Sequence, residues 1–201
     1  KKTASSYQHL LDEQGHWKTR SDVWIHFDRR GPKSGALGIG YGGDRKRCIG
    51  SELGLGIVLG DHLEQQVCII KTALGTPALT TDLTPPTMAE SGKQGGTAYL
   101  SLLKQINDSL NSLSDKFPDY TDTAGYEIAG LVLNLGEQDS DPVVYGKHLE
   151  ALISDLRSEL KIENLPVVVV GTGRGGYDET EFPEIIQVQQ TIASSPDHQG
   201  T

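Results

Sequence analysis

Two acidic side chains, Glu137 and Asp139, directly follow an apolar segment that is typical of a buried strand. Carboxylates in such a position could orient a catalytic histidine or bind a polar ligand. They could equally cap the helix that follows, because negative charge is favourable near a helix N-terminus. The spacing alone slightly favours this second interpretation.

Gly75 follows another apolar segment, residues 66–71, and is the second candidate for chemistry. A glycine there lets the backbone N–H approach a ligand, where it could stabilise an oxyanion. It could also serve only to turn the chain. From the residues alone the turn is the favoured interpretation.

Other motifs predict no further site. Residues 50–54 lack the spacing of a nucleophile elbow, so Ser51 is expected to cap the helix that it precedes. Residues 171–176 are rich in glycine but lack the Lys-Ser/Thr pair of a phosphate loop. Cys48 and Cys68 form no CxxC pair, and the histidines show no ligand spacing, so no metal site is predicted. Cys68 is expected to pack as a small hydrophobe.

The elements that must position these residues alternate between strands and helices. Strands are predicted at 22–27, 66–71, 127–135 and 165–170, and helices at 49–63, 99–113, from Asp141-Pro142 onward, and at 181–194. Residues 72–97 form a long loop, and 36–40 are of uncertain type. Strands that are apolar almost throughout predict a parallel sheet with helices on both faces. Ligands of such sheets bind beyond the carboxyl ends of the strands.

Length and charge limit the classes of function. The 201 residues suit a single domain, and no internal repeat or linker divides them. The formal charge of -9 argues against nucleic-acid and anionic-membrane partners, which need clustered Lys and Arg. No apolar run is long enough to span a bilayer.

Several segments, in this order, resemble one known family. They are residues 20–24, 40–42, 49–54, 70–75, 82–86, 125–130, 136–139 and 164–168. Together they are similar to bacterial sialate O-acetylesterase-like proteins, which resemble carbohydrate esterase family six and belong to the SGNH hydrolase class. The resemblance covers most of residues 10–201.

The resemblance implies a three-layer, flavodoxin-like α/β fold and a serine esterase that removes O-acetyl groups from carbohydrates without a metal or organic cofactor. It assigns to Gly75 an N–H for the oxyanion, while Glu137 and Asp139 shape the site and orient a histidine. It also suggests a secreted or periplasmic location. The oligomeric state stays open.

The sequence departs from the family pattern in two ways. It contains no Gly-Gln-Ser and no Asp-x-x-His segment, so we expect that it begins after the first strand and stops before the catalytic histidine. The 201 residues alone are therefore expected to be inactive. Leu135 also stands where the family has a glutamine that helps to hold the oxyanion, which favours an alternative: a catalytically silent relative with a glycan-binding or scaffold role.

Overall fold

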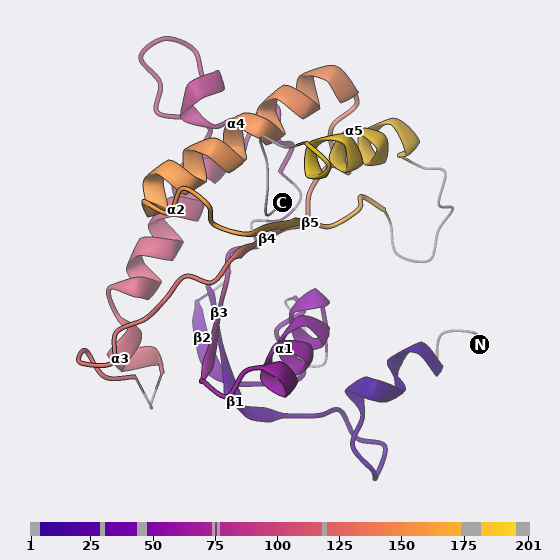
Figure 1. The fold of residues 1–201 in the computed structure, drawn as a ribbon, viewed down its shortest axis with the longest axis vertical. Coiled ribbons are helices and arrows are strands. Elements are labelled where there is room, and N and C mark those ends of the chain that lie inside the picture. The colour runs from indigo at the N-terminus through magenta and orange to yellow at the C-terminus, as the bar shows by residue number, and fades with distance from the viewer. Residues whose placement is uncertain are drawn as a thin grey trace. The chain divides into compact units, whose positions relative to one another are not determined.

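The computed structural model describes residues 5–28, 31–43, 48–73, 75, 77–117, 120–173 and 182–195. They form an α/β structure (Figure 1). The elements in chain order are η1 (Ser5–Leu10), β1 (Arg20–Asp28), β2 (Pro32–Leu37), α1 (Ser51–His62), β3 (Val67–Lys71), η2 (Pro86–Met88), α2 (Thr97–Leu110), α3 (Leu113–Lys116), β4 (Leu131–Leu133), α4 (Pro142–Leu160), β5 (Val167–Val169) and α5 (Pro183–Ala193). The chain divides into two compact units: unit 1 is Lys1–Ala73 with Lys104–Gly125, and unit 2 is Leu74–Leu103 with Tyr126–Thr201.

Unit 1 contains a three-stranded mixed sheet in the order β2-β1-β3. β1 pairs parallel with β3, so the strands predicted at 22–27 and 66–71 are confirmed. β2 pairs antiparallel with β1, an orientation that the sequence did not predict. β2 includes residues 36 and 37, the first two residues of the segment 36–40 whose type the sequence left uncertain. Gly31, at the turn between the two strands, has a φ of 114°, which favours glycine.

The core of unit 1 lies between this sheet and α1. Alternate residues of β1, namely Val23, Ile25 and Phe27, are buried, because successive side chains of a strand point to opposite faces. Leu53 and Ile57 of α1 pack in the same cluster. The outer side of α1 is also apolar, and Val58 there is exposed.

Unit 2 contains the parallel pair β4 and β5, over which α4 and α5 lie (Figure 1). Its core joins side chains of both strands to those of the two helices, including Leu133, Val167, Leu149 and Ile185. The strands predicted at 127–135 and 165–170 are present but shorter. On the other face of the pair Val132 and Val168, which are register partners, are 43% and 57% exposed.

The start of α4 is confirmed as the sequence predicts. Asp141 is the N-cap, and its carboxylate accepts hydrogen bonds from the N–H groups of Val143 and Val144 at 2.9 and 3.0 Å. Pro142 occupies the first helical position, where the missing N–H costs nothing. At the other end Lys161 adopts a left-handed conformation with φ of 58°.

In the described residues of the long segment between β3 and α2, the short η2 is the only regular structure, but the segment is held to the rest of unit 2. Leu79 and Leu83 are buried in the core. Asp155 of α4 accepts hydrogen bonds from the N–H and hydroxyl of Thr87 at 3.0 and 2.5 Å. Packing and side-chain acceptors therefore replace the backbone ladder here.

Two local predictions are wrong. Ser51 does not cap α1, because the N-cap is Gly50 and no side chain caps it by a hydrogen bond. The carboxylate of Glu52 instead accepts the Gly50 N–H at 2.8 Å. Cys68 is exposed rather than packed, since β3 lies at the edge of its sheet. Both Cys48 and Cys68 are free thiols.

Candidate functional site

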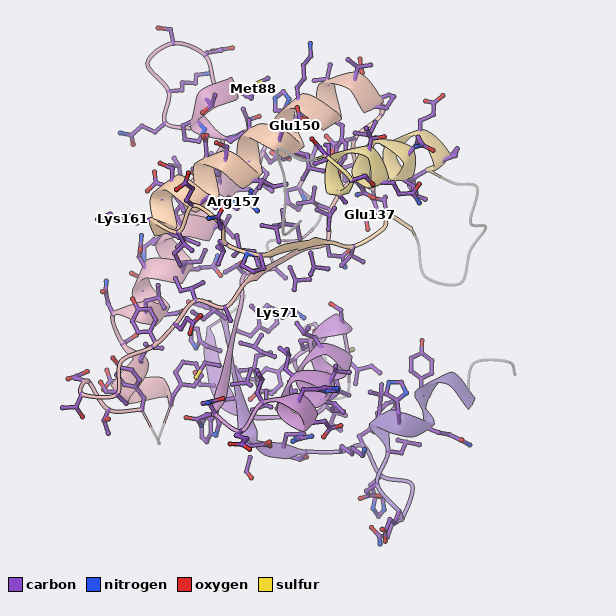
Figure 2. All side chains as sticks on the ribbon, in the orientation of Figure 1. Lys71, Met88, Glu137, Glu150, Arg157 and Lys161 are labelled. Atoms are coloured by element: carbon purple, nitrogen blue, oxygen red, sulfur yellow. The ribbon has the colours of Figure 1, made fainter. Side chains whose placement is uncertain are left out.

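The candidate site is the segment after β4, residues 135–139, where the sequence places Glu137 and Asp139. Leu135 and Gly136 are buried, Glu137 is half-buried and Asp139 is only 5% exposed. Figure 2 shows Glu137 on the stretch of chain that leads from β4 to α4, near α5. Glu137 and Asp139 therefore follow the carboxyl end of a parallel strand, which is where the ligands of parallel sheets bind.

Asp139 uses both carboxylate oxygens to hold a remote part of the chain. Oδ2 accepts the N–H of Leu79 at 3.0 Å, while Oδ1 accepts the N–H and the hydroxyl of Thr80 at 3.0 and 2.8 Å. Hydrogen bonds to an ionised carboxylate are about twice as strong as neutral ones. Asp139 thus fixes the segment after Gly75 onto the segment after β4.

Glu137 has the opposite character. It is half-buried, and among the described residues it makes no hydrogen bond or ion pair. A carboxylate without a partner at the carboxyl end of a strand is free to accept a hydrogen bond from a ligand or from a histidine.

Gly75 is exposed and has a φ of 94°, a conformation that favours glycine. No atom lies within 4 Å of where its Cβ would be, and its N–H has no acceptor in the described part of the chain. No hydrogen bond joins Gly75 directly to Glu137 or Asp139 among the described residues. The connection that the structure shows is Asp139 binding residues 79 and 80, a few positions further along the chain.

Beneath this segment lies a buried polar network that the sequence interpretation missed. Gln189 of α5, Tyr145 of α4 and Thr172, which follows β5, all approach the carbonyl oxygen of Leu135, at 3.2, 3.3 and 3.0 Å. Burial raises the pKa of Tyr145 to about 12, so its hydroxyl keeps its proton at neutral pH. One signal was present: Gln189 interrupts the apolar face of α5 formed by Ile185 and Ile192.

The side chain of Leu135 belongs to the core of unit 2 and is 8% exposed. It therefore offers a ligand neither a donor nor a free surface. The backbone carbonyl of the same residue is the centre of the polar network. Position 135 therefore contributes an anchored backbone carbonyl to this segment and no polar side chain.

Unit 1 holds a separate buried ion pair at the carboxyl end of β3. Lys71, labelled in Figure 2, donates to Oε2 of Glu52 at 2.7 Å and to the carbonyl of Tyr41 at 2.6 Å. Glu52 is 4% exposed, and its other oxygen accepts the Gly50 N–H. Because both charges are paired, these residues join β3 to α1 rather than offer a free reactive group.

No group of three or more His, Cys, Asp or Glu side chains that could hold a metal ion occurs within the part of the chain that the structure describes. Across the same residues, no helix combines the length and the apolar character needed to cross a membrane. Residues 174–176 of the glycine-rich segment lie outside the described residues.

Comparison with known proteins identifies the family. Residues 5–199 match the family described as "Carbohydrate esterase, sialic acid-specific acetylesterase". The chain belongs to this carbohydrate esterase family. The match spans nearly the whole sequence, and it confirms the resemblance inferred from the ordered motifs.

The fold of this chain is also similar to that of a solved structure. A protein from Arabidopsis thaliana, determined by X-ray crystallography, is similar with a TM-score of 0.57 at 18% sequence identity. The alignment covers 86% of this chain and 64% of the Arabidopsis chain, so this chain spans less than two thirds of that structure. At this identity the likeness shows the fold alone. A comparison with curated proteins gave no match.

Proposed function

We propose that the chain is part of a serine esterase that removes O-acetyl groups from carbohydrates. The observation that carries this proposal is the match of residues 5–199 to the family of sialic acid-specific acetylesterases. The serine oxygen attacks the acetyl carbonyl and gives its proton to a general base, which passes the proton to the departing sugar oxygen and so releases the sugar with a free hydroxyl. Water then attacks the acyl-enzyme, which releases acetate and restores the serine hydroxyl. No serine or histidine of this sequence is assigned to these steps, because it contains neither motif of the family.

Three residues of the chain have roles in this proposal. The N–H of Gly75, which has no acceptor among the described residues, donates to the oxyanion of the tetrahedral intermediate. Asp139 shapes the site by holding residues 79 and 80. Glu137, whose carboxylate is unpaired within the described residues, orients the catalytic histidine or binds a substrate hydroxyl.

The finer description of the fold is part of the same proposal. We assign the chain to the flavodoxin-like, three-layer arrangement of SGNH hydrolases, as one domain with helices on both faces of a parallel sheet. The parallel pairs β1–β3 and β4–β5 support it, as does the match to the carbohydrate esterase family. An experimentally determined structure in which these pairs do not belong to one sheet would contradict it.

The proposed activity is tested on the protein expressed from its complete natural reading frame. Acetate release is measured from O-acetylated sialic acid and from 4-nitrophenyl acetate. A serine-directed fluorophosphonate should abolish the release and label one serine. A folded protein that releases no acetate from either substrate, and that takes up no label, contradicts the esterase proposal.

The role of Glu137 is tested by the isosteric change Glu137→Gln. We expect kcat/KM to fall on the order of 10²-fold or more, as for loss of a residue that serves acid-base catalysis. The matched control is Gln138→Ala, because Gln138 is its exposed neighbour and makes no hydrogen bond among the described residues. Equal activity of the two variants would show that Glu137 has no role in catalysis or substrate binding.

One observation favours a second function, a catalytically silent relative that binds acetylated glycans. The side chain of Leu135 is apolar and buried in the core, so the position cannot supply a donor to an oxyanion. Calorimetry distinguishes the two functions: binding of O-acetylated sialic acid without acetate release supports the silent relative.

A further inference from the structure

Gln189 is a polar residue in an otherwise apolar helix face. It lies between Ile185 and Ile192 on the buried side of α5 and, like them, is 4% exposed. Burying an amide is unfavourable unless each of its groups finds a hydrogen-bond partner. A leucine of similar size would fill the same space without this requirement, so packing alone does not explain the residue.

The partners of Gln189 fix the orientation of its amide. Oε1 accepts the backbone N–H of Thr172 at 3.1 Å, and an N–H group can only donate. Nε2 faces the hydroxyls of Tyr145 and Thr172, each at 2.8 Å, and the carbonyl of Leu135 at 3.2 Å. A carbonyl can only accept, so the exchanged assignment of oxygen and nitrogen is excluded.

The protons of the network balance. The two hydrogens of Nε2 go to the hydroxyl oxygens of Tyr145 and Thr172, which lie at the shorter distances. The hydroxyl protons of both residues then go to the carbonyl of Leu135, at 3.3 and 3.0 Å. One amide therefore directs two hydroxyls onto one carbonyl, and such buried chains of hydrogen bonds strengthen one another.

The network fixes the orientation of the first peptide of the candidate site, between Leu135 and Gly136. All peptide bonds are trans in the described residues, so fixing the Leu135 carbonyl turns the N–H of Gly136 to the opposite side, away from Gln189. Gly136 has a φ of 128°, and a Cβ there would lie 2.3 Å from Oγ1 of Thr172. The peptide that leads to Glu137 thus has one geometry, set by α5 and by the segment after β5.

We propose that Gln189 is a positioning residue of the esterase site: through the hydroxyls of Tyr145 and Thr172 it fixes the Leu135–Gly136 peptide, and with it the carboxylate of Glu137. Gln189 itself touches no reacting atom. The inference rests on the proposed function, because positioning matters for catalysis only if residues 135–139 form an active site.

The principal test compares Gln189→Leu with Ile192→Val in the protein expressed from its complete reading frame. Both changes lie on the same buried face of α5, but only the first removes the polar network. With 4-nitrophenyl acetate we expect kcat of Gln189→Leu to fall about tenfold to a hundredfold with KM little changed, because small misplacements of catalytic groups have effects of this size. Ile192→Val should keep its kcat within about twofold.

A second readout does not depend on activity. Hydrogen exchange of the amides of residues 136–139, measured by mass spectrometry, should become faster in Gln189→Leu and stay unchanged in Ile192→Val. Faster exchange with no acetate release by the unsubstituted protein would contradict the esterase but support the fixed peptide. Unchanged exchange, or an active enzyme whose kcat survives Gln189→Leu, would overturn the positioning role.

Two further variants keep the test decisive if Gln189→Leu does not fold. Tyr145→Phe removes one hydroxyl of the network and should lower kcat in the same direction by a smaller factor. Gln189→Glu adds a carboxyl beside the hydroxyls of Tyr145 and Thr172, and the charges of Glu137 and Asp139 act on the same Tyr145 hydroxyl. In this buried position only the protonated form of the new carboxyl can donate a hydrogen bond. The kcat of this variant should therefore decline with rising pH relative to the unsubstituted enzyme, whereas a purely structural residue would give parallel pH profiles.

Discussion

Glu137 and Asp139 are two positions apart in sequence but differ in what surrounds them. Asp139 is buried and has three donors, from Leu79 and Thr80, whereas Glu137 is half-buried and makes no contact of this kind among the described residues. The sequence pattern identifies both residues only as acids that follow a strand. Only the remote partners separate a carboxylate that holds the chain from one that is free for a ligand.

The first prediction concerns Asp139→Ala. The change leaves the N–H groups of Leu79 and Thr80 without their acceptor, so we expect the free energy of unfolding to fall by roughly 2–4 kcal/mol. Asp139→Asn keeps one carbonyl oxygen and should cost less. Urea denaturation monitored by circular dichroism measures both, with Ser140→Ala at the exposed neighbour as the control. Equal stability of all four proteins would show that these hydrogen bonds contribute nothing.

The sequence predicted that the acids of the candidate site follow a strand, but not which groups they contact. Glu137 and Asp139 follow the predicted strand, as expected, and Asp141 caps α4 as predicted. The partners of Asp139 are about sixty positions earlier in the chain, and those of Gln189 come from three other segments. A local pattern contains no information on such distant pairings, because the fold alone brings them together.

At the scale of elements, α1 shows why some glycines are required. Mutation to any larger residue at Gly56 would place a Cβ 2.2 Å from Cδ2 of Leu37 and 3.1 Å from side chains of Val23 and Ile69. Gly54 lies on the same helix, but beyond its chain neighbours and the backbone of its own helix no atom of the described residues lies within 4 Å of its Cβ position. The helix approaches the sheet closely at one glycine and not at the other.

The second prediction compares these two glycines. Gly56→Ala should destabilise the protein by about 1–3 kcal/mol, since overpacking forces the helix away from the sheet. Gly54→Ala should instead raise stability by about 0.5–1 kcal/mol, because glycine is unfavourable within a helix. Thermal unfolding of the two variants measures the difference. Opposite signs are expected, and equal effects would contradict the close contact of α1 with Leu37.

The elements themselves were largely predictable, and the exceptions have physical reasons. Strong apolar periodicity predicted α2 and α4, and β-branched runs predicted β1 and β5. The antiparallel pairing of β2 was not predicted, because glycine and proline weaken the strand pattern there. The exposure of Cys68 was missed because an apolar run does not reveal whether its strand lies at a sheet edge.

At the scale of the whole molecule, two buried tyrosines link stability to alkaline pH. Burial raises the pKa values of Tyr99 and Tyr145 to about 12 each. The Tyr145 hydroxyl takes part in the Gln189 network, but that of Tyr99 has no hydrogen-bond partner among the described residues. The two phenols are equally protonated in the folded protein but differ in what their hydroxyls contribute.

The third prediction follows from the sign of these shifts. An unfolded tyrosine ionises near pH 10, while the folded ones keep their protons to about pH 12, so the free energy of unfolding falls as pH rises between these values. Tyr99→Phe and Tyr145→Phe should each make the decline shallower. Denaturation in urea at a series of pH values measures it, and an identical slope in all three proteins would contradict the raised pKa values.

At neutral pH the same two variants should differ. Tyr145→Phe removes a hydroxyl that donates to Leu135 and accepts from Gln189, and we expect it to cost about 1–3 kcal/mol. Tyr99→Phe removes a hydroxyl with no partner in the described structure, so it should leave stability unchanged or raise it. A larger loss for Tyr99→Phe would show that its hydroxyl has a partner after all.

The way in which residues 77–96 are held has a practical consequence for engineering. Asp139 accepts hydrogen bonds from Thr80, and Asp155 accepts hydrogen bonds from Thr87. Near the end of this segment the N–H of Gly96 donates to the carbonyl of Thr84 at 2.8 Å. None of these contacts involves residues 90–94, which are all exposed. An epitope, a fluorescent probe or a new pair of chain ends can therefore be introduced near Gly92 with little disturbance. The same change near residue 82 would disturb the segment whose residues Thr80 and Thr87 are held by Asp139 and Asp155.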